Sequence, residues 1–302
     1  MALKDIKAKI GATNRMHTVT RAMEAVSAVK MRKTQEMALG GRAYARAALS
    51  VLARLSGSQE VLAHPLATTR EVKNIALVVI TSDKGLAGSL NSGVLKKAQS
   101  VVEKYQKEQV KVFAIGKKGM EYFSRRGYTI LKAEENQRDD VALSVMREVS
   151  EAASKGFLNE SFDEVVAVYS NFKSTFEQTP TARTLLPLSI ENLTELVEDI
   201  RPAKGKWSEN GDIVSPASYT VEPSGDEVLS ILVPRLVAVS LYHMLLEAKA
   251  SEHSARMVAM KNASDKSKEV VKDLTRTFNK IRQAAITREV SEIVGGREAL
   301  AN

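Results

Sequence analysis

The sequence predicts an α/β protein that combines a long antiparallel two-helix coiled coil with a central, mostly parallel α/β domain. Three observations lead to this fold class. No Gly or Pro occurs between Pro234 and Gly295, and apolar residues recur there at heptad spacing. The first 57 residues are also poor in Gly and Pro. Between these two segments, β-branched runs alternate with amphipathic stretches, which is typical of a parallel sheet.

The 302 residues divide into four parts on this basis. We expect an N-terminal coiled-coil helix over 1–57 and a central α/β (foot) domain over 70–190. A connection follows over 191–225, where charged residues mix with Pro, Gly and Ser. The C-terminal coiled-coil helix is expected over 226–302.

The N-terminal segment predicts one long helix over 3–57, with Gly40-Gly41 as the place where it could kink. Two stripes follow helical spacing. The first, here called the Met16 stripe, is the expected seam of the coiled coil and contains Met16, Val19, Met23, Val26, Lys30, Lys33, Met37, Gly40 and Tyr44. The second, here called the Ile6 stripe, lies on a neighbouring face and contains Ile6, Ile10, Thr13, His17 and Thr20.

The central segment predicts a sheet buried on both faces, because its first strand is a continuous β-branched run. The alternation of strands and helices gives a Rossmann-like α/β domain. Strands are expected over 74–80, 110–115, 128–132 and 164–170, with an edge strand over 184–189, and helices over 91–107, 117–126 and 141–156.

The C-terminal segment has the clearest pattern. Thirteen of its 17 seam positions between Leu229 and Ala285 are apolar, so the seam must face another helix to leave water. His243 and His253 lie on the seam, ten residues apart, and are expected to be packed core residues rather than ligands of one metal. Ser264 and Ser267 interrupt the seam, which we expect to be loose or solvent-filled there.

The net charge of +8 belongs almost wholly to the first segment. Residues 1–57 carry 11 Lys+Arg and 3 Asp+Glu, whereas residues 58–225 have a net charge of −2 and residues 226–302 a net charge of +2. Such a basic helix suits an acidic partner surface. A nucleic-acid-binding coiled coil is one alternative, but aromatic residues make up only 5% of the chain and no recognition module is evident.

Enzymatic motifs are weak. The best phosphate-loop candidate, Thr81–Gly88, matches neither G-x-G-x-x-G nor the GK[ST] ending, and is interpreted as a tight strand-to-helix turn. A nucleotide-binding α/β enzyme therefore stays a second alternative, with Asp83 and Lys84 as its only charged loop residues. The chain has no Cys, which excludes disulfides, thiolate metal sites and a cysteine nucleophile. The sequence contains no run of 18 apolar residues, so no membrane span is predicted.

Four segments carry a resemblance to a known family. Thr18–Lys33, Ala250–Ser264 and Asn279–Gly295 resemble the helical signatures of the gamma subunit of F-type ATP synthase. The loop Ser82–Asn91 resembles the motif after that family's first central strand. The resemblance extends over the whole chain in the right order. Departures from the family pattern are Ala87 in place of a common Cys, Arg297 near the C-terminal tip, and a long segment over 204–225.

The resemblance implies a non-catalytic rotor, the central stalk that couples rotation of the membrane c-ring to ATP synthesis and hydrolysis at the beta subunits. It implies alpha, beta and epsilon subunits and the c-ring as partners, without nucleic acid and without direct membrane insertion. MgATP and ADP would be bound by the alpha and beta partners, and this chain would bind no cofactor or metal. The implied location is peripheral, on the cytoplasmic face of a bacterial inner membrane or the equivalent matrix face.

The resemblance also implies site residues. No residue is expected to be catalytic. Contacts that couple to the beta subunits would come from Met23, Arg256, Arg282, Gln283, Thr287, Glu289 and Glu292. The basic N-terminal shaft would present Arg21, Lys30, Arg32 and Lys33, and the loop of the foot domain would contribute Ser82, Asp83, Lys84, Gly85 and Gly88.

Overall fold

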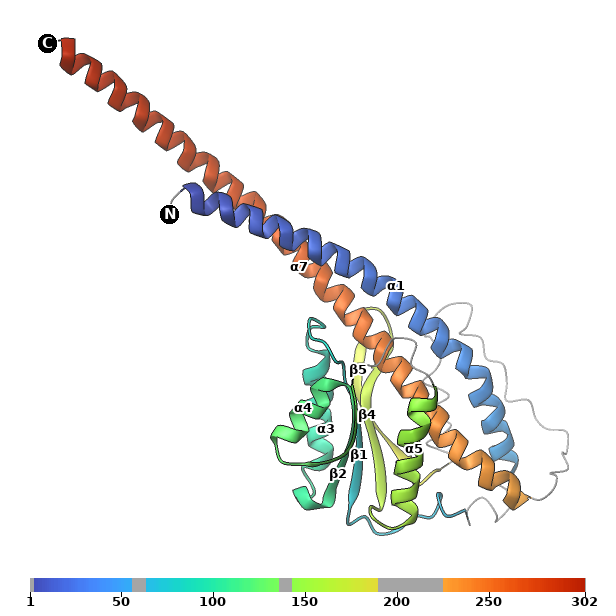
Figure 1. Cartoon of the computed structure of the whole chain (residues 1–302). Coiled ribbons are helices and arrows are strands. Elements are labelled where there is room, and N and C mark those ends of the chain that lie inside the picture. The colour runs from blue at the N-terminus through green and yellow to red at the C-terminus, as the bar shows by residue number, and fades with distance from the viewer. Residues whose placement is uncertain (1–2, 56–63, 136–142, 190–224, 302) are drawn as a thin grey trace. The chain divides into compact units, whose positions relative to one another are not determined.

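A computed structural model describes residues 3–55, 64–135, 143–189 and 225–301 (Figure 1). Two helices account for the ends of the chain, α1 (Leu3–Leu55) and α7 (Gly225–Ala301). The chain divides into two compact units, one formed by residues 1–27 and 257–302 and the other by residues 28–256. Each unit therefore contains a part of both long helices, and each is described by itself.

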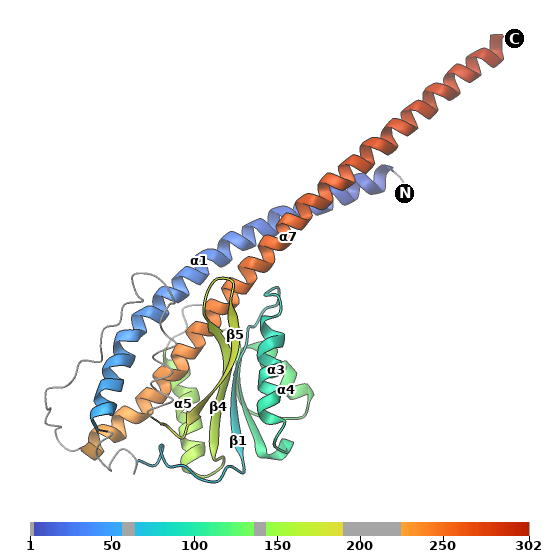
Figure 2. The ribbon, with the colours of Figure 1, turned by 180° about the vertical axis from the view of Figure 1, so that it is seen from behind.

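In the first unit, α1 and α7 lie side by side (Figures 1 and 2). The Ile6 stripe, not the Met16 stripe, is the seam on α1. Ile6 is 1% exposed and Thr20 is buried, whereas Met16, Val19 and Val26 are 54–59% exposed. The expectation that the Met16 stripe packs against the C-terminal helix was therefore wrong. The hydroxyl of Thr20 can be buried because it donates to the carbonyl oxygen of Met16 in its own helix, at 2.9 Å.

The seam on α7 is confirmed within this unit. Met260, Ser264 and Ser267 are buried, and the later seam positions from Val271 to Ala285 are half-buried. The expected loose, solvent-filled stretch at Ser264 and Ser267 was wrong, since these side chains are only 5% and 6% exposed. Ser267 donates to the carbonyl oxygen of Ala263 at 2.7 Å, which satisfies its hydroxyl without water.

The second unit contains a five-stranded sheet in the order β3-β2-β1-β4-β5. The first four strands are parallel, and β5 pairs antiparallel with β4 at one edge. The edge strand is longer and earlier than the expected 184–189, because a tight turn at Ser174–Glu177 returns the chain directly beside β4. The strands are β1 (Ile75–Ile80), β2 (Val110–Ile115), β3 (Thr129–Glu134), β4 (Glu164–Phe172) and β5 (Gln178–Leu186).

Helices cover both faces of this sheet (Figure 1). On one face lie α3 (Leu90–Val102) and α4 (Lys117–Arg125), which bury Val94, Ala98 and Phe123. On the other face lie α5 (Leu143–Leu158) and the part of α7 from Val233 to Ala248. The three-layer arrangement explains why β1 is buried along its whole length. A short 3-10 helix, η1 (Lys107–Gln109), precedes β2.

The start of α7 is a core helix of this domain. The helix contains an 18-residue window with a mean hydropathy of 1.5, long and apolar enough to cross a membrane by composition. About 67% of that window is buried inside the protein. The apolar residues from Val233 to Leu245 pack on the sheet and on α5, which accounts for the high hydropathy.

Candidate partner-binding surface

The loop after β1 is held by its own polar side chains. Asn91 accepts a hydrogen bond from the Ser82 N–H at 3.0 Å and donates to the Ser82 hydroxyl at 2.7 Å. The Asp83 carboxylate accepts from the Lys117 N–H at 2.9 Å, so it caps the start of α4, where the helix dipole favours a negative charge. Lys84 is exposed, and Gly88 adopts the left-handed region with φ +58°. The interpretation of this loop as a strand-to-helix turn is confirmed.

The crevice where doubly wound folds usually bind a ligand is filled. In this sheet it lies at the carboxyl ends of β1 and β4, the point at which the strand order reverses. Here α7 lies against that point, and Leu245, Ala248 and Glu252 face Ile80 and Ser170 around a cavity of about 10 Å³. A cavity of this size holds at most one water molecule. A nucleotide has no room there.

Three polar side chains of α7 bind main-chain carbonyls at this edge of the sheet. The Ser251 hydroxyl donates to the Ser170 carbonyl at 3.0 Å, and the Ser254 hydroxyl donates to the Thr175 carbonyl at 2.6 Å. Arg256 donates to the Gly85 carbonyl at 3.3 Å and pairs with Glu252 at 2.7 Å.

Arg256 is therefore engaged within the chain, with only 11% of its side chain exposed. Sequence reasoning missed Ser251 and Ser254. The available signal was two Ser residues three positions apart, one turn of a helix, within the recognisable segment Ala250–Ser264.

A second set of buried polar side chains lies on α7. His243 Nε2 lies 3.1 Å from the Glu247 carboxylate, one turn further along α7, and both side chains are buried. Burial, followed by the nearby Glu247 carboxylate, raises the pKa of Tyr169. His243 and His253 are both buried, so the expectation that they are packed core residues is confirmed.

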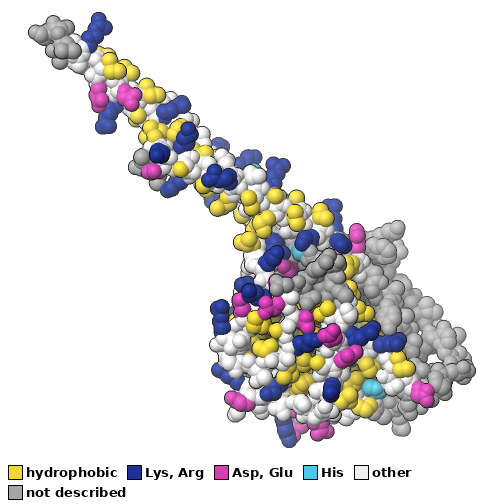
Figure 3. All heavy atoms as spheres, viewed as in Figure 1, with side chains coloured by type: hydrophobic (Ala, Val, Ile, Leu, Met, Phe, Trp, Pro, Cys, Tyr) yellow, Lys and Arg dark blue, Asp and Glu magenta, His cyan; other side chains and the backbone are white. Residues whose placement is uncertain are grey.

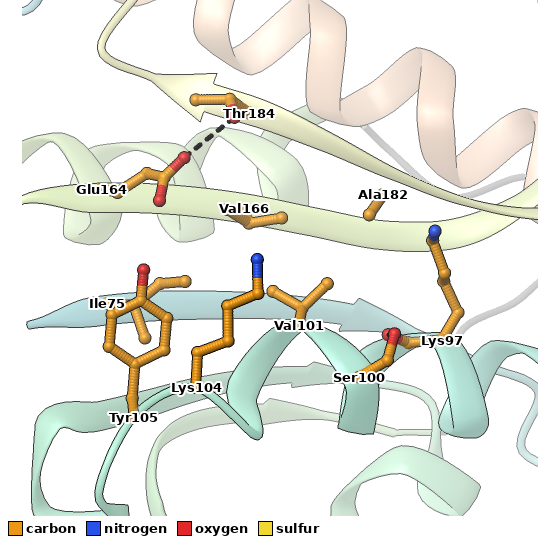
Figure 4. Close-up of a pocket in the computed structure, with 10 residues that line it drawn as sticks. All are labelled: Ile75, Lys97, Ser100, Val101, Lys104, Tyr105, Glu164, Val166, Ala182 and Thr184. Carbon is orange, nitrogen blue, oxygen red and sulfur yellow. Dashed lines mark hydrogen bonds between the residues drawn. The ribbon is translucent and has the colours of Figure 1, made fainter. Parts of the chain in front are cut away.

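A more open groove lies on the other face of the sheet, with a volume of about 370 Å³ (Figure 4). Its floor includes Ile75 and Val166. Lys97 of α3 and Lys104, two residues beyond the end of α3, extend over it. Burial, followed by the charge of Glu164, raises the pKa of Tyr105 at its rim. Both lysines are exposed, so the groove has the character of a solvated surface with an apolar floor.

The outer face of α1 carries apolar and basic side chains together. In the first unit, the uncovered apolar residues of the Met16 stripe are Met16, Val19 and Val26, and Met23 between them is half-buried. Figure 3 shows basic and hydrophobic side chains interspersed along the helices. The predicted basic residues are all exposed, namely Arg21, Lys30, Arg32 and Lys33.

The last part of α7 continues past the start of α1 (Figure 1), and its side chains from Ile286 to Arg297 are exposed. Ile286, Val290 and Ile293 form an apolar stripe on this stretch, each more than half exposed. The predicted contact residues Arg282, Gln283, Thr287, Glu289 and Glu292 are exposed as well. The Thr287 hydroxyl donates to the Gln283 carbonyl, and Glu292 lies 3.8 Å from Arg288.

Among the described residues, no group of three or more His, Asp or Glu side chains is arranged to hold a metal ion. Within the described ranges, the exposed surfaces that could contact a partner include the outer face of α1, the tip of α7 and the groove beside α3.

Comparison with known proteins decides the family. The family model described as "ATP synthase" matches residues 2–300. The ATP synthase gamma chain of Roseiflexus castenholzii is 41% identical over 99% of this chain and 98% of its own length. The chain belongs to the ATP synthase gamma chain family. The gamma chain of Chlorobium phaeobacteroides is 38% identical over the same shares of the two chains.

Solved structures agree with this family. A chain of the Tetrahymena thermophila mitochondrial ATP synthase central stalk and c-ring structure has 27% identity and a TM-score of 0.61. The match extends over 82% of the present chain and 99% of the Tetrahymena chain. A chain of the Euglena gracilis mitochondrial ATP synthase, with 18% identity and a TM-score of 0.65, shares the fold over 99% of this chain and 94% of its own length. The family model and the curated relatives confirm the resemblance of the sequence to gamma subunits.

Proposed function

We propose that this gamma chain is the rotor shaft of a proton-translocating F-type ATP synthase. In this role it couples rotation of a membrane ring of c subunits to ATP synthesis and hydrolysis at the beta subunits. The observation that carries the proposal is the uncovered apolar stripe of Met16, Val19 and Val26 on a coiled coil whose seam is already filled by the Ile6 stripe. A long exposed apolar stripe indicates a partner surface.

The coupling would work by contact rather than by chemistry. A shaft that contacts its beta partners differently at each angle shifts their conformations, because a partner's equilibrium moves only through differential interaction. The proposed contributors are Met23, Arg282, Gln283, Thr287, Glu289 and Glu292. Arg256, which the sequence placed in the same set, is instead held inside the chain by Glu252 and the Gly85 carbonyl.

The exposed basic side chains of α1 suit a moving contact with acidic loops of the beta subunits. An exposed ion pair contributes only about 0–1 kcal/mol, so each can form and break as the shaft turns.

The chain would have no catalytic centre of its own and would bind no cofactor. The packing of α7 supports this, because Leu245, Ala248 and Glu252 fill the crevice in which doubly wound folds bind a nucleotide. MgATP and ADP would bind to the alpha and beta partners. The foot domain would rest on epsilon and on the c-ring, and the complex would hold it peripherally on the cytoplasmic face of a bacterial inner membrane or the equivalent matrix face.

Co-purification tests the proposal. We expect the chain, co-expressed with the alpha and beta subunits of the same organism, to form a complex that hydrolyses ATP. The isolated chain should show no hydrolysis above buffer. A folded, monodisperse chain that does not associate with those subunits would contradict the proposal.

A further inference from the structure

The place where α7 meets the sheet has two kinds of contact with different mechanical properties. From Val233 to Ala248 the helix packs by apolar side chains on the sheet and on α5. Such contacts are non-directional and resist separation better than sliding or rotation. Beyond Ala248 the contacts become directional, because Ser251, Ser254 and Arg256 donate hydrogen bonds.

Each of these three donors binds a main-chain carbonyl on a different segment. Ser251 binds Ser170 within β4, Ser254 binds Thr175 in the turn between β4 and β5, and Arg256 binds Gly85 in the loop after β1. Main-chain acceptors near strand ends cannot swing as a side chain can. Three bonds to three separate segments therefore fix both the rotation of α7 about its axis and its position along that axis.

The donors are themselves held in place. Ser251 and Ser254 are 0% exposed, and the Gln178 side chain lies 3.4 Å from the Ser254 hydroxyl. The Glu252 carboxylate, one turn before Arg256, holds its guanidinium at 2.7 Å. Glu252 also lines the small cavity at the switch point, so the filled crevice and the three bonds belong to one arrangement.

We propose that Ser251, Ser254 and Arg256 form a carbonyl clamp that locks the rotation of α7 to the foot domain, so that torque passes between them. This inference rests on the proposed rotor function and adds to it the residues that make the joint stiff. The loop ends that bind a ligand in related folds hold a helix here. The three side chains are positioning residues, since they contact only this chain.

Single-molecule measurement of the complex tests the clamp. Because the chain has no Cys, Glu108→Cys in the exposed 3-10 helix η1 provides the only thiol of this chain for attaching a bead to the foot domain. The head is immobilised and locked with a non-hydrolysable ATP analogue, and the angular variance of the bead is recorded. The variants are Ser254→Ala, the double variant Ser251→Ala/Ser254→Ala, and Arg256→Gln.

Variance is inversely proportional to torsional stiffness, so loss of the bonds made by the Ser251 and Ser254 hydroxyls should raise it roughly twofold or more in the double variant. Ser254→Ala and Arg256→Gln should give smaller rises, and Ser254→Thr, which keeps the hydroxyl, should restore the wild-type variance. Ser230→Ala is the matched control, because exposed Ser230 bonds only the Glu227 carbonyl of its own helix.

Unchanged variance in Ser254→Ala and Arg256→Gln would overturn the clamp, even if their melting temperatures fell, since a purely stabilising role lowers the melting temperature alone. If the double variant does not assemble, these single variants decide the outcome. The wild-type complex must also rotate on MgATP. Failure there counts against the rotor function, whereas a rotating wild type with unaltered variants counts against the clamp only.

Discussion

Arg70 and Asp163 form a half-buried ion pair that joins the segment before β1 to the segment before β4. Arg70 Nε lies 2.9 Å from the Asp163 carboxylate, and the same guanidinium donates to the carbonyls of Phe157 and Phe162. The other carboxylate oxygen accepts the N–H groups of Lys73 and Asn74 at 3.0 and 2.9 Å. One carboxylate thus organises the entry into two neighbouring parallel strands.

Asp163→Asn should lower the free energy of unfolding at pH 7 by about 1.5–3 kcal/mol, because an amide cannot accept from all three donors. Burial raises the pKa of Asp163, but the N–H groups of Asn74 and Lys73 and the Arg70 guanidinium outweigh this, so its pKa lies below its ordinary value.

The stabilisation is therefore complete above the unfolded pKa of about 3.9 and is lost as the pH falls through the lower folded pKa. Urea unfolding at pH 7 and below pH 4 checks this, with exposed Glu151→Gln as the control. If the difference in free energy of unfolding between wild type and Asp163→Asn is as large below pH 4 as at pH 7, this pH dependence is contradicted.

The choice of seam on α1 can be tested with one pair of variants. Ile6→Ala truncates a side chain that is 1% exposed and should lower the free energy of unfolding by about 2–4 kcal/mol. Val19→Ala alters a side chain that is 57% exposed and should change stability by less than about 0.5 kcal/mol. Thermal unfolding followed by helical circular dichroism measures both. A larger loss for Val19→Ala would identify the Met16 stripe as the packed face after all.

Two helical glycines should respond in opposite directions to the same substitution. A Cβ at Gly156 would overlap the Phe162 ring. This overlap outweighs the better helix propensity of Ala, so Gly156→Ala should lower the free energy of unfolding by about 1–2 kcal/mol. A Cβ at Gly295 meets nothing within 4 Å, and Gly295→Ala should stabilise the tip of α7 by up to about 1 kcal/mol. Urea unfolding measures the first, and helical circular dichroism on heating measures the second. Equal effects in both would show that propensity alone decides.

Arg282 and Gln283 test the proposed contacts of α7. Replacing both with Ala should leave the chain folded, because both side chains are exposed, and should leave assembly with alpha and beta subunits possible. Turnover of the assembled complex should fall about fivefold or more, which corresponds to a loss of roughly 1 kcal/mol in the rate-limiting step. Lys268→Ala, exposed on the same helix, is the control. Wild-type ATPase activity and proton pumping in the double variant would remove this pair from the coupling surface.

The two stripes on α1 show what the periodicity of apolar residues can and cannot predict. Sequence spacing correctly predicted a long helix that pairs with the C-terminal helix. It selected Met16, Val19 and Val26 as the seam because they are more apolar than His17 and Thr20. The Ile6 stripe packs instead, since hydroxyls can be satisfied within their own helix and small side chains fit a close helix pair. A helix with partners on two sides has two stripes, and one chain's sequence does not say which partner each stripe meets.

The foot domain was more predictable than its joint to α7. Its four parallel strands were found because continuous β-branched runs, such as Ile75–Ile80, indicate burial on both faces. The bonds from Ser251 to Ser170 and from Arg256 to Gly85 link residues 81 and 171 positions apart. Local pattern carries no information at that separation, so only the folded arrangement reveals the filled crevice.

ATP-driven rotation of the foot domain tests the rotor proposal most directly. The assembled complex carries a bead on the Cys of the Glu108→Cys variant, with the head immobilised, and is supplied with MgATP. We predict continuous rotation in one direction that stops when ATP is removed. A complex that hydrolyses ATP while the bead only fluctuates about a fixed angle would contradict the proposal.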